Sequence, residues 1–186
     1  MLKMQWSHEA ATQAQSWADQ CHYGHSSKSD RRVAGQSCGQ NLLRTVSGPF
    51  SWDDVLKIWS TDEARSFRYG HHGNSMQTVG HYTQMVWAST YQVGCAYRNC
   101  GYWQIYVCHY CPSGNLRGEE MRPYKSGSSC SACPNDCEGN LCRNYCPYVD
   151  YYSNCDSVSR RHDVCSRPGI SSFCGATCKC KGKIHS

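Results

Sequence analysis

The stretch CSACPNDCEGNLCRNYC, from Cys130 to Cys146, opens the part of the chain that decides the fold. Ten of the sixteen cysteines lie in the last 57 residues, and the five that follow this stretch are Cys155, Cys165, Cys174, Cys178 and Cys180. The apolar side chains between them are too few for burial alone to offset the entropy lost on folding. Disulfides must therefore hold this segment together. Because disulfides persist in oxidising compartments, we expect a secreted, extracellular protein.

The rest of the composition predicts a medium-sized domain followed by a small one. The chain has 186 residues, an even number of cysteines and a net charge of only +5, which argues against a nucleic-acid partner. No apolar run approaches the ~18 residues of a membrane-spanning helix, so no transmembrane segment is expected. The positive charge gathers near the end, where from Val158 onward the single acid Asp163 is outnumbered by Arg160, Arg161, Arg167, Lys179, Lys181 and Lys183.

Apolar periodicity predicts two helices before residue 70. In the first, over residues 7–21, one face is formed by Ala10, Ala14, Trp17 and Cys21. The second begins at a capping box of Ser51 and Asp54, and its apolar stripe contains Trp52, Leu56, Trp59 and Phe67. Position 63 completes this stripe, so the pattern predicts that the acid Glu63 faces inward.

Two strands are predicted after residue 90, where the periodicity changes. Residues 91–97 (YQVGCAY) and 102–108 (YWQIYVC) are short aromatic and β-branched runs separated by Asn99 and Gly101. They predict an antiparallel pair. After Asn115 the chain loses all periodicity through Ser129, which is typical of a linker, and we expect the domain boundary there.

Two pairs of cysteines have the spacing of a metal site or a redox centre. Cys108-x-x-Cys111 and Cys130-x-x-Cys133 are separated by 18 residues, as in a zinc ribbon. A compartment that keeps four thiolates reduced for zinc would not oxidise the other twelve cysteines. Cys111 precedes a Pro-Ser-Gly-Asn turn rather than opening a helix, which argues against a thioredoxin-type centre. We expect structural disulfides for all sixteen.

Three titratable residues are candidates for a metal or acid–base site. His25 follows the first predicted helix, and His81 lies in the run GHYTQMVW (Gly80–Trp87). An ionised Glu63 on a buried helix face is costly unless a cation or a metal pairs with it, or a proton neutralises it. A neighbouring imidazole or divalent ion is therefore expected, and a hydrogen-bonded core glutamate is the alternative.

Two further stretches resemble a known family. GHYTQMVWAST (Gly80–Thr90) and IYVCHYCPSGNL (Ile105–Leu116) resemble the two signature motifs of the CAP superfamily. The ten-cysteine tail resembles that of cysteine-rich secretory proteins (CRISPs), most of all those of venoms and secretory glands. In those proteins the counterpart of Met1–Trp6 is internal, behind a leader and a first helix. We therefore expect this N-terminus to be a truncation that lacks the first family helix.

The resemblance implies an α+β fold in three parts. Residues 1–129 would form the CAP (PR-1-like) domain, an α-β-α sandwich, and residues 130–145 a disulfide-linked hinge. Residues 146–186 would form a small helical cysteine-rich domain that is similar to the sea-anemone ShK potassium-channel toxins. The implied disulfide pairs are Cys21 with Cys100, Cys38 with Cys111, Cys95 with Cys108, Cys130 with Cys137, Cys133 with Cys142, Cys146 with Cys180, Cys155 with Cys174, and Cys165 with Cys178.

The CAP cleft of the family holds two histidines and two glutamates, and the matching positions here are His25, Gln40, Glu63 and His81. Gln40 departs from the pattern because an amide replaces a carboxylate. One extra residue also separates Trp59 from Glu63 compared with the family spacing. Some relatives bind zinc through the two histidines, so the resemblance implies a zinc or other divalent-cation site at His25, His81 and Glu63. We expect no catalytic residues and no enzyme activity.

The function implied by the resemblance is modulation or block of an ion channel from its extracellular side. The anemone toxins use a Lys-Tyr pair six and five residues before the counterpart of Cys174, where this chain has Pro168 and Gly169. A different surface must then act, and the candidates beside the six basic residues are Tyr148, Tyr151, Tyr152 and Phe173. The alternatives are a module that binds lipids, sterols or acidic glycans, and a metal-dependent hydrolase.

Overall fold

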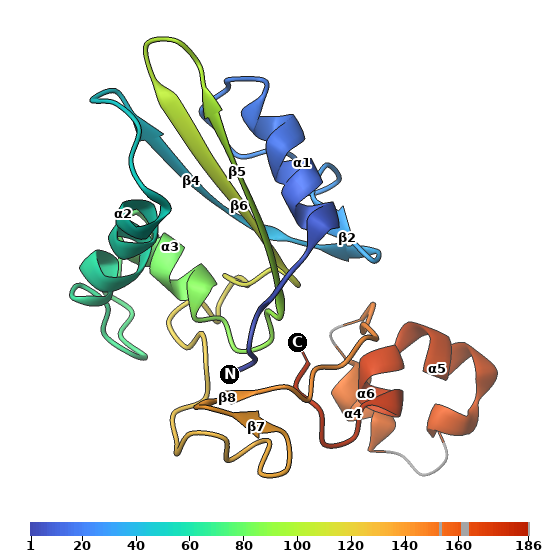
Figure 1. Ribbon diagram of the computed structural model, residues 1–186. Coiled ribbons are helices and arrows are strands. Elements are labelled where there is room, and N and C mark those ends of the chain that lie inside the picture. Colours follow the sequence, from blue (N-terminus) through green and yellow to red (C-terminus); the bar gives the residue numbers. More distant parts are fainter. Residues whose placement is uncertain (153, 161–163, 186) are drawn as a thin grey trace. The chain divides into compact units, whose positions relative to one another are not determined.

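The computed structural model describes residues 1–152, 154–160 and 164–185, which form two compact units (Figure 1). The larger unit comprises residues 4–125, and the smaller comprises the residues from 126 onward together with Met1–Lys3. Met1–Lys3, expected in the larger domain, pair instead with Cys142, whose carbonyl accepts the Lys3 N–H over 2.8 Å. None of the helices in the described ranges combines the length and the apolar character needed to span a bilayer.

A four-stranded sheet is the centre of the larger unit. Its strand order is β1-β5-β6-β4, with β6 antiparallel to both neighbours and β1 parallel to β5. The predicted hairpin is confirmed as β5 and β6. The strands are β1 (Gln5–Trp6), β4 (Gly39–Thr45), β5 (Gln92–Asn99) and β6 (Gln104–Cys111), and a separate ribbon pairs β2 (Arg32–Val33) with β3 (Gln36–Ser37).

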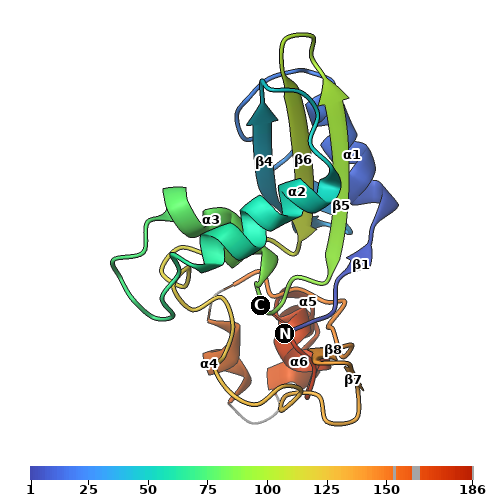
Figure 2. The ribbon, with the colours of Figure 1, turned by 60° about the vertical axis from the view of Figure 1, so that its left-hand side comes forward.

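Helices cover both faces of this sheet (Figures 1 and 2). β6 is buried at all eight positions, because its alternate side chains face opposite helical layers. Ile105 and Val107 pack in the core cluster of α1 (His8–Ala18), whereas Tyr106 and Tyr110 pack with Trp59 on the other face. The larger unit is therefore an α-β-α sandwich, as expected.

The helix α1 lies directly against β5 because Gly94 has no side chain. A Cβ at Gly94 would lie 2.2 Å from the backbone nitrogen of Ala11. Ser7 caps the helix, since its Oγ accepts the Ala10 N–H over 3.2 Å. The helix ends at Ala18, three residues before the predicted end.

The other face carries α2 (Trp52–Lys57), which continues into one π-helical turn, η1 (Ile58–Asp62), and α3 (Met76–Met85), which packs against η1. The predicted capping box is confirmed. Ser51 Oγ accepts the Asp54 N–H over 3.1 Å, and Asp54 Oδ2 accepts the Ser51 N–H over 3.2 Å.

The predicted apolar stripe is wrong in its first turn. Trp52 and Leu56 are each 37% exposed, whereas Val55 and Trp59 are fully buried. The buried face of this segment therefore carries Val55 and Trp59, while Trp52 and Leu56 lie on its exposed side. Further along, the segment also contains a wider π turn before Glu63, which a uniform helical period does not describe.

The smaller unit has short elements and little apolar core. Within its described part, one ribbon pairs β7 (Cys137–Glu138) with β8 (Leu141–Cys142). The helical segments are α4 (Cys155–Ser159), the 3-10 turn η2 (Val164–Ser166), α5 (Pro168–Phe173) and α6 (Gly175–Lys179). Its buried apolar cluster consists of Cys146, Ala176 and Cys180. Disulfides thus take the place of a larger core.

All sixteen cysteines are paired, and the eight disulfides are the same pairs that the family resemblance implies. Three lie in the larger unit and five in the smaller. They are Cys21–Cys100, Cys38–Cys111, Cys95–Cys108, Cys130–Cys137, Cys133–Cys142, Cys146–Cys180, Cys155–Cys174 and Cys165–Cys178.

Candidate functional site

Glu63 and His81 are joined by a short hydrogen bond in the larger unit. His81, on α3, contacts Glu63 Oε1 through Nδ1 over 2.6 Å, and the Tyr82 N–H donates to Glu63 Oε2 over 2.9 Å. Both carboxylate oxygens therefore accept hydrogen bonds, and the carboxylate side chain is only 13% exposed. The ring of His81 also stacks on Trp59, with centroids 5.6 Å apart. The imidazole expected beside an inward-facing Glu63 is thus His81.

The π turn η1 explains how Glu63 reaches His81 despite the extra residue that follows Trp59. A π turn closes hydrogen bonds from i to i+5, so it holds one residue more than an α turn. It lies over Ile58–Asp62, and Glu63 follows it in helical conformation. The additional residue is absorbed in the turn while Trp59 stays fully buried.

His25 is held by Gln40 in a similar way. The loop after α1 places His25 beside β4, where its Nδ1 donates to Gln40 Oε1 over 2.9 Å. The neighbouring Ser26 N–H donates to the same oxygen over 3.1 Å. The amide oxygen of Gln40 thus receives two hydrogen bonds, a role that an acceptor-only carboxylate would also fill.

Sequence reasoning missed His109, a further polar side chain that contacts this group through Gln40. Gln40 Nε2 lies 3.0 Å from His109 Nε2. Because an amide nitrogen can only donate, the His109 Nε2 must accept and is therefore unprotonated. Its Nδ1 is buried and has no hydrogen-bond partner among the described residues. Burial on β6, and secondarily the positive charge of Arg31, lowers the pKa of His109 from 6.5 to about 4. The clue in the sequence was that His109 lies in a strand whose polar and apolar residues do not alternate, which indicates a strand buried on both faces.

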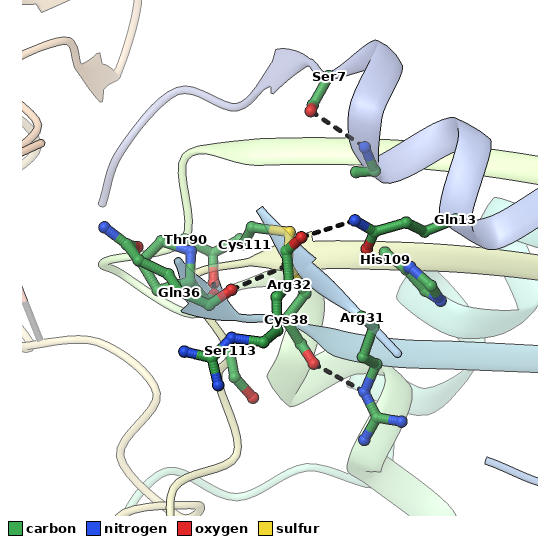
Figure 3. Close-up of a disulfide and its surroundings, with 12 residues drawn as sticks. Ser7, Gln13, Arg31, Arg32, Gln36, Cys38, Thr90, His109, Cys111 and Ser113 are labelled. Carbon is green, nitrogen blue, oxygen red and sulfur yellow. Dashed lines mark hydrogen bonds between the residues drawn. A yellow bond between two sulfur atoms is a disulfide. The ribbon is translucent and has the colours of Figure 1, made fainter. Parts of the chain in front are cut away.

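Arg31 ties this group to the Cys38–Cys111 disulfide. Its Nε donates to the carbonyl of Cys38 over 2.8 Å, and its Nη1 donates to Ser26 Oγ over 3.0 Å. Figure 3 shows the hydrogen bond from Arg31 to Cys38, with Gln13 of α1 donating to the Arg32 carbonyl nearby. The guanidinium therefore braces the loop that carries His25.

The structure brings the predicted site residues together as two pairs, His25 with Gln40 and His81 with Glu63. In the part of the chain that the structure describes, no hydrogen bond joins one pair to the other. Within the same ranges, the one cluster of three potential metal-ligating side chains is Cys130, Cys133 and Cys142, and all three are in disulfides. The site thus contains two histidines whose Nδ1 atoms both take part in hydrogen bonds, that of His25 with Gln40 and that of His81 with Glu63.

The predicted channel-binding residues lie in the smaller unit, and most are exposed. Tyr151 is 65% exposed, Tyr152 57%, Phe173 50% and Tyr148 46%. Tyr152 contacts Phe173 edge to face, with centroids 5.6 Å apart, and Lys179 Nζ lies 4.6 Å from the centre of the Tyr148 ring. Arg161 lies outside the described residues, whereas the exposed cations are Arg160, Arg167, Lys179, Lys181 and Lys183.

Two family models match the sequence. The model of the cysteine-rich secretory protein family (CAP) matches residues 1–110, and the Crisp model matches residues 130–185. Human Cysteine-rich secretory protein 2 is 44% identical over 190 residues, which cover the whole of this chain and 76% of that protein.

Solved structures with the same fold include two from related proteins. The crystal structure of NaASP2 with Zn²⁺ matches with a TM-score of 0.64 and 29% identity over 76% of each chain. Venom allergen-like protein 4 from Schistosoma mansoni matches with a TM-score of 0.55 and 27% identity, over 68% of this chain and 76% of that one.

Proposed function

The chain belongs to the cysteine-rich secretory proteins of the CAP superfamily, and from this premise we propose that it is a secreted effector that binds an ion channel from the extracellular side and modulates its conductance. Eight disulfides fit an extracellular protein. We propose that it is not an enzyme, since the amide of Gln40 cannot serve as an acid or a base in the cleft.

The observation that carries the proposal is the exposed aromatic surface of the smaller unit. Four aromatic side chains, Tyr148, Tyr151, Tyr152 and Phe173, are each about half exposed or more. Aromatic side chains are enriched among the residues that dominate binding energy at protein interfaces. Lys179 lies over one of these rings, so the surface combines cationic and aromatic character.

The five disulfides of the smaller unit support this role. A cross-linked unit loses little conformational entropy on binding, so a small surface can bind efficiently. Pro168 and Gly169 begin α5 at the positions of the toxins' Lys-Tyr pair, so the proposed contact does not plug the pore with that pair. We propose instead that the aromatic surface covers an acidic outer face of the channel, and that the cations assist.

Electrophysiology on a panel of channels tests this proposal. The full chain should alter the current of at least one channel, and Tyr151→Ala with Tyr152→Ala should weaken the effect by at least about tenfold, as expected for interface hot spots. Tyr102→Ala is the matched control, because Tyr102 is 97% exposed on the larger unit. Equal potency of the double variant and the wild type would refute the assignment.

We also propose that His25 and His81 bind zinc through their Nε2 atoms. The supporting observation is that Gln40 and Glu63 hold the two Nδ1 atoms, because a metal-ligating histidine usually donates its other N–H to such a neighbour. In this proposal Glu63 orients His81 rather than binding the metal, since both of its oxygens already accept hydrogen bonds. A bound ion would tie the loop after α1 to α3.

Calorimetric titration with zinc tests the second proposal. His25→Ala with His81→Ala should abolish binding, and affinity should fall as the pH drops through ~6, where free imidazole protonates. The control is His71→Ala with His72→Ala, an exposed pair in a loop. Zinc binding by the first double variant at the wild-type level would rule out this site.

A further inference from the structure

The smaller unit contains a pocket of about 400 Å³, and two of the cations assigned above to the channel surface, Lys181 and Lys183, line it. Its lining residues come from two segments, residues 143–147 and residues 181–183, and also include Asp136. Its volume falls within the roughly 300–1,000 Å³ range of small-molecule sites. A ligand of the size of one or two sugar units would therefore fit.

The walls of the pocket are fixed by hydrogen bonds and a disulfide. The Ile184 N–H donates to the Asn144 carbonyl over 2.9 Å, and the Cys146 N–H donates to the Ile184 carbonyl over 3.1 Å. The Cys146–Cys180 disulfide joins the first segment to the residue that directly precedes the second. The pocket is therefore formed before any ligand arrives, which reduces the entropy lost on binding.

The lining is cationic. It contains three basic side chains, Arg143, Lys181 and Lys183, and one acidic side chain, Asp136. Arg143 is partly neutralised by Glu138, whose Oε2 lies 3.4 Å from its Nη1. Neither lysine takes part in an ion pair with any residue that the structure describes, so both ammonium groups are available to an anion.

Asn144 holds together two segments beside the pocket. Its Nδ2 donates to the carbonyls of Ala132, over 3.0 Å, and Gly182, over 2.8 Å. Its Oδ1 is buried and has no partner among the described residues, although the residue lines the pocket and is only 9% exposed. The two hydrogen bonds from Nδ2 hold residues 132 and 182 in place beside the pocket, so Asn144 contributes to its rigidity.

We propose that this pocket binds an acidic sugar unit, bearing a sulfate or carboxylate, of an extracellular glycan. The acid group would pair with Lys181 and Lys183, which are exposed. Tyr145 and Pro147 add apolar surface on which a sugar ring can pack. A sugar meets these conditions better than an acidic peptide, because the lining consists of turns rather than the strand edge or helix groove that usually receives a peptide. The inference does not depend on the channel proposal.

Titration of the full, oxidised chain with a sulfated heparin-derived disaccharide, followed by calorimetry and amide NMR, tests the inference. We expect saturable binding with resonance shifts at Gly182 and at the side-chain amide of Asn144. Lys181→Gln with Lys183→Gln should weaken binding by at least about tenfold, since two charge-assisted hydrogen bonds are lost. The control is Lys28→Gln with Lys57→Gln, which removes the same charge from exposed sites on the larger unit.

Four outcomes would overturn the inference. The first is that the pocket variant binds the disaccharide as the wild type does, and the second is that the wild type does not bind it. The third is that a Glu-rich hexapeptide shifts the Gly182 and Asn144 resonances while the disaccharide does not, which would assign the pocket to a protein partner. A neutral disaccharide such as lactose should not bind, and binding equal to that of the sulfated one would also contradict recognition of the acid group. Unchanged NMR spectra of the variants away from the pocket will establish that they fold.

Discussion

Gln40 donates a hydrogen bond from Nε2 to Nε2 of His109 over 3.0 Å, and its Oε1 accepts one from His25. One amide thus connects a histidine of the cleft to a histidine of the sheet core. Because Nε2 of His109 accepts, the single proton of its neutral ring lies on Nδ1, which is buried. A carboxylate in place of Gln40 could not donate and would favour a protonated His109. Gln40, the residue that departs from the family pattern, therefore pairs with a neutral His109.

The first prediction is that His109 makes the larger unit acid-labile. Its pKa is about 4 in the folded chain and 6.5 ordinarily, so between these values the unfolded chain binds a proton that the folded chain does not. Stability should fall as the pH drops through this window, by up to about 3 kcal/mol at pH 4. Urea unfolding followed by tryptophan fluorescence at pH 7 and pH 4 measures this, because all six tryptophans lie in the larger unit.

His109→Gln keeps an uncharged acceptor near Gln40 and should remove that part of the pH dependence. His72→Gln, a change at an exposed position, should leave it intact. If wild type and His109→Gln lost the same stability on acidification, the buried histidine would not be the cause.

The second prediction concerns Gln40→Glu. A carboxylate beside His109 stabilises the imidazolium, so the pKa of His109 should rise above its present value of about 4. NMR titration of the His109 ring protons gives the value directly. Gln20→Glu adds the same charge at an exposed position and should not change it. An unchanged or lowered pKa in Gln40→Glu would show that the two side chains are not electrostatically coupled.

The parts of the fold that the sequence predicted depend on local rules. The Ser51–Asp54 capping box follows from two residues one turn apart, and the β5–β6 hairpin from two aromatic runs with turn residues between them. Glu63 was also placed on the inner face. Its partner His81 was a reasonable expectation because an inward-facing acid needs a donor or a cation.

The parts that were missed depend on distant segments or irregular turns. The π turn is invisible to a search for a uniform helical period, and the exposure of Trp52 and Leu56, which precede that turn, depends on which face of α2 packs on the sheet. His109 becomes part of the site only because β4 and β6 are in a register that pairs Gln40 with it. The role of Asn144 could not be predicted because its side chain donates to the carbonyls of Ala132 and Gly182, which are far apart in the sequence.

The third prediction is that Glu63 tunes zinc binding without being a ligand. Glu63→Gln keeps one acceptor for His81 but places an amide donor where a carboxylate oxygen accepts the Tyr82 N–H. The loss of this support should lower zinc affinity by roughly 10- to 100-fold, as for other residues that orient metal ligands. Calorimetry measures the change, with exposed Glu119→Gln as the control. Complete loss of binding would instead indicate that Glu63 is itself a ligand.

The fourth prediction separates electrostatic attraction from contact in the proposed channel interaction. Arg160, Arg167 and Lys179 are exposed cations that do not line the pocket of the smaller unit. Charges of this kind attract an acidic receptor at a distance, and salt screens that attraction beyond ~8 Å at physiological ionic strength. Replacing all three with glutamine should therefore slow the onset of the effect on current, while recovery on washout changes little. Raising the salt concentration should slow the onset for the wild type and much less for the triple variant.

Wash-in and wash-out rates of the current measure this prediction, because onset reports association and recovery reports dissociation. The control variant replaces Lys28, Lys57 and Arg117 with glutamine, which removes the same charge from exposed positions of the larger unit. Its onset rate should stay near that of the wild type if the receptor faces the smaller unit. Equal slowing in both variants would mean that net charge alone sets the encounter rate. A faster recovery with an unchanged onset in the first variant would mean that these cations act in direct contact instead of by steering.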